Sequence, residues 1–133
     1  MMKKIRIGCG AGFSGDRIEP AIILAEKAAL DYLVLECLAE RTIALAQKRK
    51  MLDATKGYDP LLEKRITTLL PHLIKNHTKL ITNMGAANPI EAAKKIIEIA
   101  AHQNIKIKVA AITGDDVLST IQQFSYSITD LEN

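Results

Sequence analysis

The sequence has no tryptophan, and aromatic residues of all kinds make up only 4% of its 133 residues. A chain with so few rings lacks the stacking surfaces that bind single-stranded nucleic acid. Lysine and arginine number 18 against 15 for aspartate and glutamate, and the one short basic run, residues 48–50, has no aromatic residue within it. Charge and ring content therefore predict no nucleic-acid partner.

Long hydrophobic runs are also missing, since none approaches the ~20 residues needed to span a bilayer. The basic residues near the start are not followed by the apolar stretch of an export signal. Cys9 and Cys37 are too few for a metal framework and are expected to be reduced thiols. We therefore expect a cytoplasmic protein that binds no membrane. Its 48% hydrophobic and 25% charged residues predict one folded domain over residues 1–133.

Strand-like and helix-like segments alternate along the chain. Short apolar runs rich in β-branched residues predict buried strands at residues 4–8, 32–37, 79–83 and 107–113. Apolar residues at helical spacing predict helices over residues 18–29, 38–52, 62–73 and 92–100. This alternation is typical of parallel βαβ units. We expect an α/β fold with a four-stranded, mainly parallel sheet flanked by helices in Rossmann-like layering, with half of a β/α barrel as the alternative.

Two helix starts are marked by an aspartate or asparagine followed by proline. Asp59 can cap a helix whose first residue is Pro60, and Asn88 precedes Pro89 in the same way. Glu91 is placed to reach back to the Asn88 amide and complete a capping box. Pro71 lies inside a predicted helix, where it predicts a kink or a break.

Glycine and polar residues gather in the turns that follow the predicted strands, which are residues 8–17, 36–42, 83–89 and 113–116. These turns hold six of the seven glycines, although such loops also need glycines and caps for structural reasons. Because the carboxyl ends of parallel strands meet at one edge of the sheet, we expect a ligand site there. The residues expected to contact the ligand are Gly10, Gly12, Ser14, Gly15, Asp16, Arg17, Glu40, Arg41, Asn83, Gly85 and Asn88.

Three acids at this edge are the candidate catalytic residues: Glu36, Asp115 and Asp116. Neighbouring carboxylates can do general acid and base chemistry, and the same oxygens suit Mg²⁺. Arg41 begins a predicted helix, where a cation is disfavoured by the helix dipole, so it needs an anionic partner in a ligand or in a nearby glutamate. Asn83 is the other candidate for orienting the ligand. The cofactor stays open between Mg²⁺, NAD and none.

A glycine loop supports a nucleotide hypothesis. Residues 10–15 fit the pattern G-x-G-x-x-G between a predicted strand and helix, and Glu36 stands where a ribose-binding acid is expected. The loop is nevertheless longer and more polar than a tight turn requires, and the following helix starts late. A loop that holds one ligand group, without a dinucleotide, fits at least as well.

The turns also resemble a known family. The segments IGCGAGFSGDR (7–17), DYLVLECLAERT (31–42), GYDP (57–60), ITNMGAANP (81–89) and TGDD (113–116) are similar, in the same order, to the N-terminal domain of the acyclic terpene utilisation protein A family. The resemblance implies a role in bacterial breakdown of acyclic terpenes such as citronellol and geraniol through acyl-CoA intermediates. It also implies that the chain is the opening portion of a longer domain.

Three functional hypotheses follow from the residues and the resemblance. The first is a module that binds or transforms a small carboxylate or acyl-CoA-type metabolite in terpene catabolism. The second is a module that binds NAD or another nucleotide through the glycine loop. The third is a structural segment without activity of its own, whose sheet is completed by further copies in a homo-oligomer or by a missing C-terminal remainder of the domain.

Overall fold

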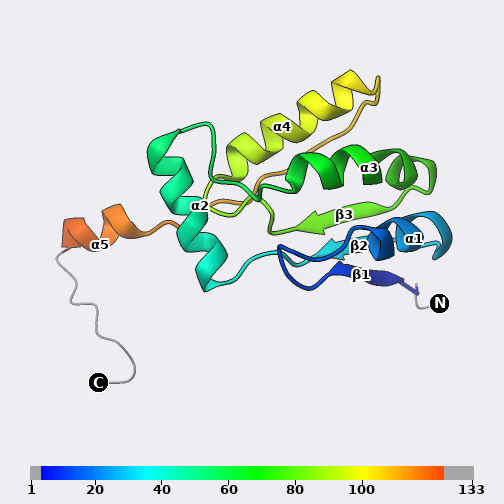
Figure 1. Ribbon diagram of the computed structural model, residues 1–133, viewed down its shortest axis with the longest axis horizontal. Helices are drawn as coiled ribbons and strands as arrows, with labels where there is room; N and C mark the ends of the chain where they lie inside the picture. The colour runs from blue at the N-terminus through cyan, green and yellow to red at the C-terminus, as the bar shows by residue number, and fades with distance from the viewer. Residues whose placement is uncertain (1–3, 125–133) are drawn as a thin grey trace.

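Figure 1 shows the computed structural model, which describes residues 4–124. Residues 1–3 and 125–133 of the predicted domain lie outside this description. The strands are β1 (Ile7–Ala11), β2 (Tyr32–Leu35) and β3 (Lys79–Thr82). The helices are α1 (Glu19–Lys27), α2 (Glu40–Leu52), α3 (Leu62–Lys75), α4 (Pro89–His102) and α5 (Leu118–Phe124). The first four helices agree with the sequence prediction in order and approximate extent.

The three strands form one sheet in the order β1-β2-β3, and both neighbouring pairs are parallel. Ile7 pairs with Tyr32, which pairs with Lys79. The prediction of an α/β fold with a parallel sheet is therefore confirmed, although the sheet is narrower than expected.

The predicted fourth strand, residues 107–113, is wrong: this segment forms neither helix nor strand and makes no strand pairing within residues 4–124. Side chains alternate between half-buried and exposed up to residue 109, and residues 110–120 are all exposed. The alternating apolar pattern matches one face of a strand, but a strand also needs a backbone partner, which local sequence does not encode. β3 is consequently left as an edge strand.

The core lies between the sheet and helices α1, α3 and α4. Leu33 and Leu35 of β2 are fully buried, and they belong to a hydrophobic cluster with residues of all three helices. Connections that join adjacent parallel strands in sequential order place their helices on one face of a sheet, because the crossovers are right-handed. Layering with helices on both faces, as in a Rossmann fold, is absent from the described chain. Sequential order with helices on one face is also the arrangement of a β/α barrel segment.

Close packing explains one glycine of the first loop. β1 lies at residues 7–11, later than the predicted 4–8, so that Gly10 is inside the strand. A Cβ at Gly10 would lie 2.7 Å from Cβ of Ala21 in α1 and 2.9 Å from the Leu35 side chain. Glycine therefore allows α1 to approach the sheet.

The predicted helix start at Pro89 is confirmed, whereas α3 begins at Leu62, two residues after the predicted Pro60, with Leu61 at the N-cap position. Oδ1 of Asp59 accepts the Leu61 N–H at 2.7 Å just before α3 begins. α4 begins at Pro89, but no capping box forms because Glu91 pairs with Lys94 and the Asn88 N–H donates to the Gly85 carbonyl. α3 continues through Pro71 without a break.

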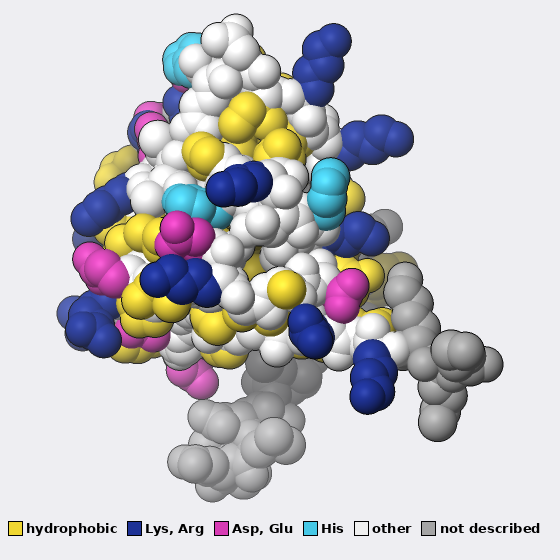
Figure 2. Space-filling view, turned by 90° about the vertical axis from the view of Figure 1, so that its right-hand side faces the viewer, with side chains coloured by type: hydrophobic (Ala, Val, Ile, Leu, Met, Phe, Trp, Pro, Cys, Tyr) yellow, Lys and Arg dark blue, Asp and Glu magenta, His cyan; other side chains and the backbone are white. Residues whose placement is uncertain are grey.

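The two ends of the sheet differ in charge. Helices α1, α3 and α4 end with Lys27, Lys75 and His102, near the amino ends of the strands. Figure 2 looks onto this end and shows more Lys and Arg side chains than Asp and Glu. Cations there complement the negative ends of the helix dipoles.

Within residues 4–124, none of the helices has the length and apolar character required to cross a membrane.

Candidate functional site at the carboxyl edge of the sheet

The loops that follow β1, β2 and β3 meet at the edge where the strands end, beside α2 (Figure 1). Glu36 and Asn83, which follow β2 and β3, are in direct contact. Nδ2 of Asn83 donates to Oε1 of Glu36 at 2.9 Å, and Oδ1 of Asn83 accepts the Cys37 N–H at 2.7 Å. The same Glu36 oxygen accepts the Leu38 N–H at 2.9 Å. Two of the predicted site residues therefore form one hydrogen-bonded unit.

These donors hold the pKa of Glu36 below its ordinary value, with the Asn83 amide as the largest cause and the Leu38 N–H as the second. Hydrogen bonds to a carboxylate favour its charged form. Glu36 is therefore ionised at neutral pH. The lowered pKa also makes this carboxylate a weaker base, so the arrangement favours neither the acid nor the base role predicted for it.

In the glycine loop, the Asp16 carboxylate occupies two of the backbone donors. Its carboxylate accepts the Gly12 N–H at 2.9 Å and the Arg17 N–H at 3.1 Å. A phosphate group would need free amides of this kind. Because an aspartate already takes two of these amides, the loop offers less support for the prediction of a nucleotide site.

Ser14 contacts a residue far away in the sequence. Its Oγ donates to Oδ2 of Asp59 at 2.6 Å, and Asp59 is itself buried. The pair joins the β1–α1 loop to the segment that precedes α3. Sequence reasoning assigned Asp59 only to helix capping, and no local pattern links it to Ser14.

Arg65 of α3 is the largest fully buried side chain and was not predicted as part of the site. Its guanidinium donates to the Ser14 and Asp16 carbonyls at 2.9 Å each, and to Sγ of Cys37 at 2.9 Å. One side chain therefore fixes both the glycine loop and the end of β2. Spacing could have indicated this residue, because Arg65 lies on the apolar stripe of α3 between Leu62 and Leu69.

Burial raises the pKa of the Cys37 thiol to about 11, although the nearby Arg65 charge acts in the opposite direction. A thiol with this pKa is neutral at physiological pH and is a weak nucleophile. Cys37 therefore serves as a buried packing residue.

A hollow of about 120 Å³ opens between the start of α2 and the β1–α1 loop. Its walls combine apolar side chains with a few polar ones, and they are formed by Ser14, Cys37, Leu38, Thr42, Leu45, Arg49, Asp59, Pro60 and Ala86. Ligand pockets typically have this composition, but those that enclose a whole drug-sized molecule are larger, about 300 Å³ or more. This hollow can accept only the end of a ligand.

Arg49 is the cation of this hollow. Thr42, Leu45 and Arg49 follow one another at spacings of three and four, so one side of α2 forms a wall. Among residues 4–124, no acceptor pairs with the half-buried Arg49 guanidinium. Arg41, the cation predicted from sequence, is exposed two turns earlier and does not line the hollow.

Other predicted residues lie apart from these contacts. Asp115 and Asp116 are exposed in the segment before α5, and the described chain shows no bond between them and Glu36. Arg17 and Glu40 are exposed, while Gly15 packs on the Phe13 ring and Gly85 on Pro89. Asn88 is buried and donates to the Ala54 and Lys56 carbonyls, so it holds a loop in place.

The residues do not fit the predicted Mg²⁺ site. Within the part of the chain that the structure describes, no three His, Cys, Asp or Glu side chains are grouped to hold a metal ion. Glu36 already accepts two hydrogen bonds through one oxygen, and the two aspartates that would join it lie elsewhere.

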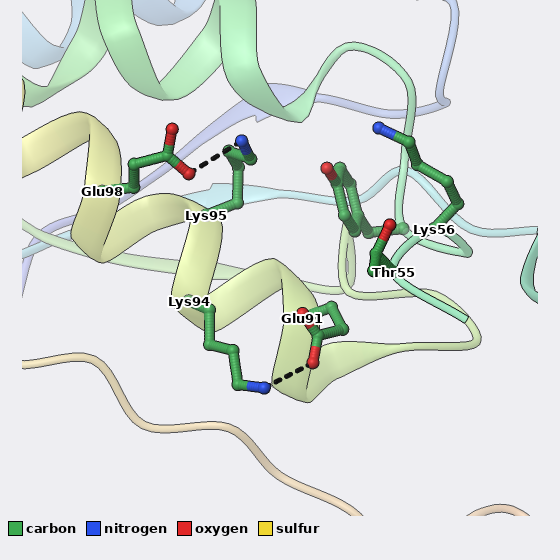
Figure 3. Close-up of a pocket in the computed structure, with 7 residues that line it drawn as sticks. Thr55, Lys56, Glu91, Lys94, Lys95 and Glu98 are labelled. Atoms are coloured by element: carbon green, nitrogen blue, oxygen red, sulfur yellow. Dashed lines mark hydrogen bonds and ion pairs between the residues drawn. The ribbon is translucent and has the colours of Figure 1, made fainter. Parts of the chain in front are cut away.

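Figure 3 shows a second hollow, of about 230 Å³, between α4 and the loop joining α2 to α3. The charged residues of α4 that line it are already paired, Lys94 with Glu91 at 2.6 Å and Lys95 with Glu98 at 2.8 Å. Lys56 also lines this hollow, and within residues 4–124 no acceptor pairs with its ammonium. The hollow beside Arg49 is the stronger candidate because Arg49 is half-buried among apolar side chains, whereas Lys56 is exposed.

Residues 5–132 match the sequence profile described as acyclic terpene utilisation family protein AtuA. No curated protein and no solved structure matches the chain. Because the profile covers nearly the whole sequence, the chain belongs to the acyclic terpene utilisation family AtuA.

Proposed function

We propose that the hollow beside α2 binds the acyl end of a small carboxylate or acyl-CoA-type metabolite. The observation that carries this proposal is the Arg49 guanidinium, which lines a hollow with apolar walls and has no acceptor among the described residues. A guanidinium prefers an anionic partner with two oxygens, as a carboxylate provides. The apolar side chains Leu38, Leu45 and Pro60 fit the hydrocarbon part of the same ligand.

Family membership narrows the ligand class. The family's association with acyclic terpene breakdown through acyl-CoA intermediates implies a branched acyl chain, which combines an apolar end with a carboxylate or thioester. A hollow of about 120 Å³ encloses only a few carbon atoms. We therefore propose a short branched acid, or the branched end of its thioester with the coenzyme outside.

The hydroxyl and carboxylate groups in the wall add specificity. Ser14 donates to Asp59 and keeps its oxygen lone pairs for a ligand donor, while Thr42 Oγ1 is already bound to the Ala39 backbone. Glu36 is ionised, but it does not line the hollow. Binding at the hollow therefore does not depend on it.

Isothermal titration calorimetry with a panel of short branched acids and their coenzyme A thioesters tests the proposal. We expect wild-type protein to release binding heat, and Arg49→Gln to weaken binding by about tenfold or more, because a charge-assisted hydrogen bond is lost. Arg41→Gln is the matched control, with the same change two turns earlier on α2, and it should bind like wild type. No heat from any compound, or equal losses in both variants, would contradict the proposal.

A further inference from the structure

Among residues 4–124, no helix covers one face of the sheet. Side chains on adjacent paired positions of the three strands lie on the face opposite the helices: Ile7, Cys9, Tyr32, Val34, Lys79 and Ile81. Ile7 is 65% exposed and Ile81 is 54% exposed. Parallel sheets are normally covered on both faces, so an open apolar face of this kind is an interaction surface.

The bare face carries opposite charges at its two ends. Lys79 lies at the amino end of the face, where its ammonium stands 5.4 Å from the centre of the Tyr32 ring. Glu36 lies at the carboxyl end on the same side as Tyr32 and Val34, because side chains alternate and the Glu36 N–H continues the pairing with Ala11. The face therefore carries a cation at one end and an anion at the other. When two such faces meet with their strands in opposite directions, each cation lies opposite an anion.

We infer that this face docks a second copy of the chain, with the strands of the two copies running in opposite directions across the interface. A two-fold axis that crosses the strands makes the interface isologous. Cys9, Val34 and Ile81 occupy adjacent paired positions and form a row across the middle of the face. The two-fold axis places this central row of one copy against the same row of the other. It also places Lys79 of each copy near Glu36 of the second copy. This pairing excludes water from the apolar row and joins the two unlike charges.

The size of the face sets the strength of association. Three strands span only about 14 Å across the sheet. Such a face is smaller than the surface that specific, stable complexes bury, about 800 Å² per partner. The dimer should therefore dissociate on dilution, and its population should depend on protein concentration.

Sedimentation velocity over a wide dilution series measures this equilibrium. We expect a shift from monomer to dimer with increasing concentration, and a loss of about tenfold or more in association for Ile81→Lys. Ile97→Lys is the matched control, because Ile97 of α4 is 52% exposed but lies in the helical layer. Circular dichroism checks that both variants are folded. A wild-type chain that stays monomeric throughout, or equal association of both variants, overturns the inference.

A charge exchange tests the orientation. Lys79→Glu and Glu36→Lys each place like charges together and should weaken association severalfold. The double variant Lys79→Glu/Glu36→Lys restores opposite charges and should regain most of the loss, as in a double-mutant cycle. If the loss of association in the double variant equals the sum of the losses in the two single variants, the antiparallel arrangement is overturned.

A short bis-maleimide cross-linker provides a second readout. The central row brings the exposed Cys9 of one copy opposite Cys9 of the other, while Cys37 is buried. We expect a covalent dimer that disappears in Cys9→Ser and persists in Cys37→Ser. A cross-linked dimer that survives Cys9→Ser contradicts the predicted packing.

Discussion

The Ser14 hydroxyl donates a hydrogen bond of 2.6 Å to the buried carboxylate of Asp59, across 45 positions of sequence. This bond and those of Arg65 connect the first loop of the fold to helix α3. The wall of the hollow therefore depends on a polar network inside the protein. Buried polar groups are costly when they lose a partner, so the network can be probed through stability.

Replacing Asp59 by Ala should lower the free energy of unfolding by about 2 to 3 kcal/mol, because the Ser14 hydroxyl and the Leu61 N–H both lose an acceptor. Chemical denaturation monitored by circular dichroism measures the change. Asp53→Ala is the control, since Asp53 is an exposed aspartate that bonds only to the nearby Thr55. Equal losses in the two variants would contradict a special role for Asp59.

Arg65→Met should destabilise the fold by about 3 kcal/mol, because the Ser14 and Asp16 carbonyls both lose a donor. Arg65→Lys should recover only part of this loss, since one ammonium cannot reproduce the planar set of donors. Urea titrations compare the variants with Arg17→Met, which removes an exposed arginine. Full stability in Arg65→Lys would show that charge alone, without the donor geometry, supports the network.

The two thiols should react at very different rates with a thiol reagent under native conditions. Cys9 is exposed, whereas Cys37 is buried with its pKa raised to about 11. One thiol per chain should therefore react quickly at neutral pH, and the second only on unfolding. Mass spectrometry of the labelled peptides assigns the sites, and fast labelling of Cys37 would contradict this account.

Cys37 should also make stability depend on pH at the alkaline end. Its pKa is 9.0 when unperturbed and about 11 in the folded chain, so the folded state holds the proton longer than the unfolded state. The contribution of Cys37 to the free energy of unfolding is therefore fully present below pH 9. It falls by at most about 2 kcal/mol as the pH rises to 11. Denaturation of wild type and Cys37→Ala across this range separates the thiol from other groups, since the variant should show a smaller fall.

Removing the Asn83 amide should raise the pKa of Glu36 toward its ordinary value, because the largest cause of the lowered pKa is lost. The lowered pKa implies that the contribution of Glu36 to stability is present above its unfolded pKa and is lost as the pH falls through its folded pKa. A carbon-13 NMR titration of the Glu36 carboxyl in Asn83→Ala measures the shift. Asn88→Ala is the control and should leave this titration unchanged, since Asn88 contacts other residues.

Apolar spacing along the sequence was sufficient for the first four helices and for three strands, and the alternation of these elements indicated a parallel sheet. It failed for residues 107–113, where an alternating pattern is present but the structure supplies no partner strand. Strand pairing is a tertiary property, so a pattern that fits a strand cannot establish that one forms.

Only part of the site could be predicted from the sequence, because some of its residues are brought together by tertiary contacts. Glu36 and Asn83 follow adjacent parallel strands, and topology alone brings them together. Asp59 and Arg65 reach the edge through side-chain contacts over long sequence distances, which periodicity does not reveal. Arg41 was predicted because it lies in the first turn of a helix, whereas the side of α2 that faces the hollow, with Arg49, is set by packing.

Chemical-shift mapping by nitrogen-15 NMR tests the central claim most directly, using a short branched acid added to the labelled protein. Our account predicts perturbed amides at Ser14, Cys37 and Thr42, with the changes abolished in Arg49→Gln and retained in Arg41→Gln. Perturbations confined to the hollow beside Lys94 and Glu98, or none at saturating acid, would contradict it.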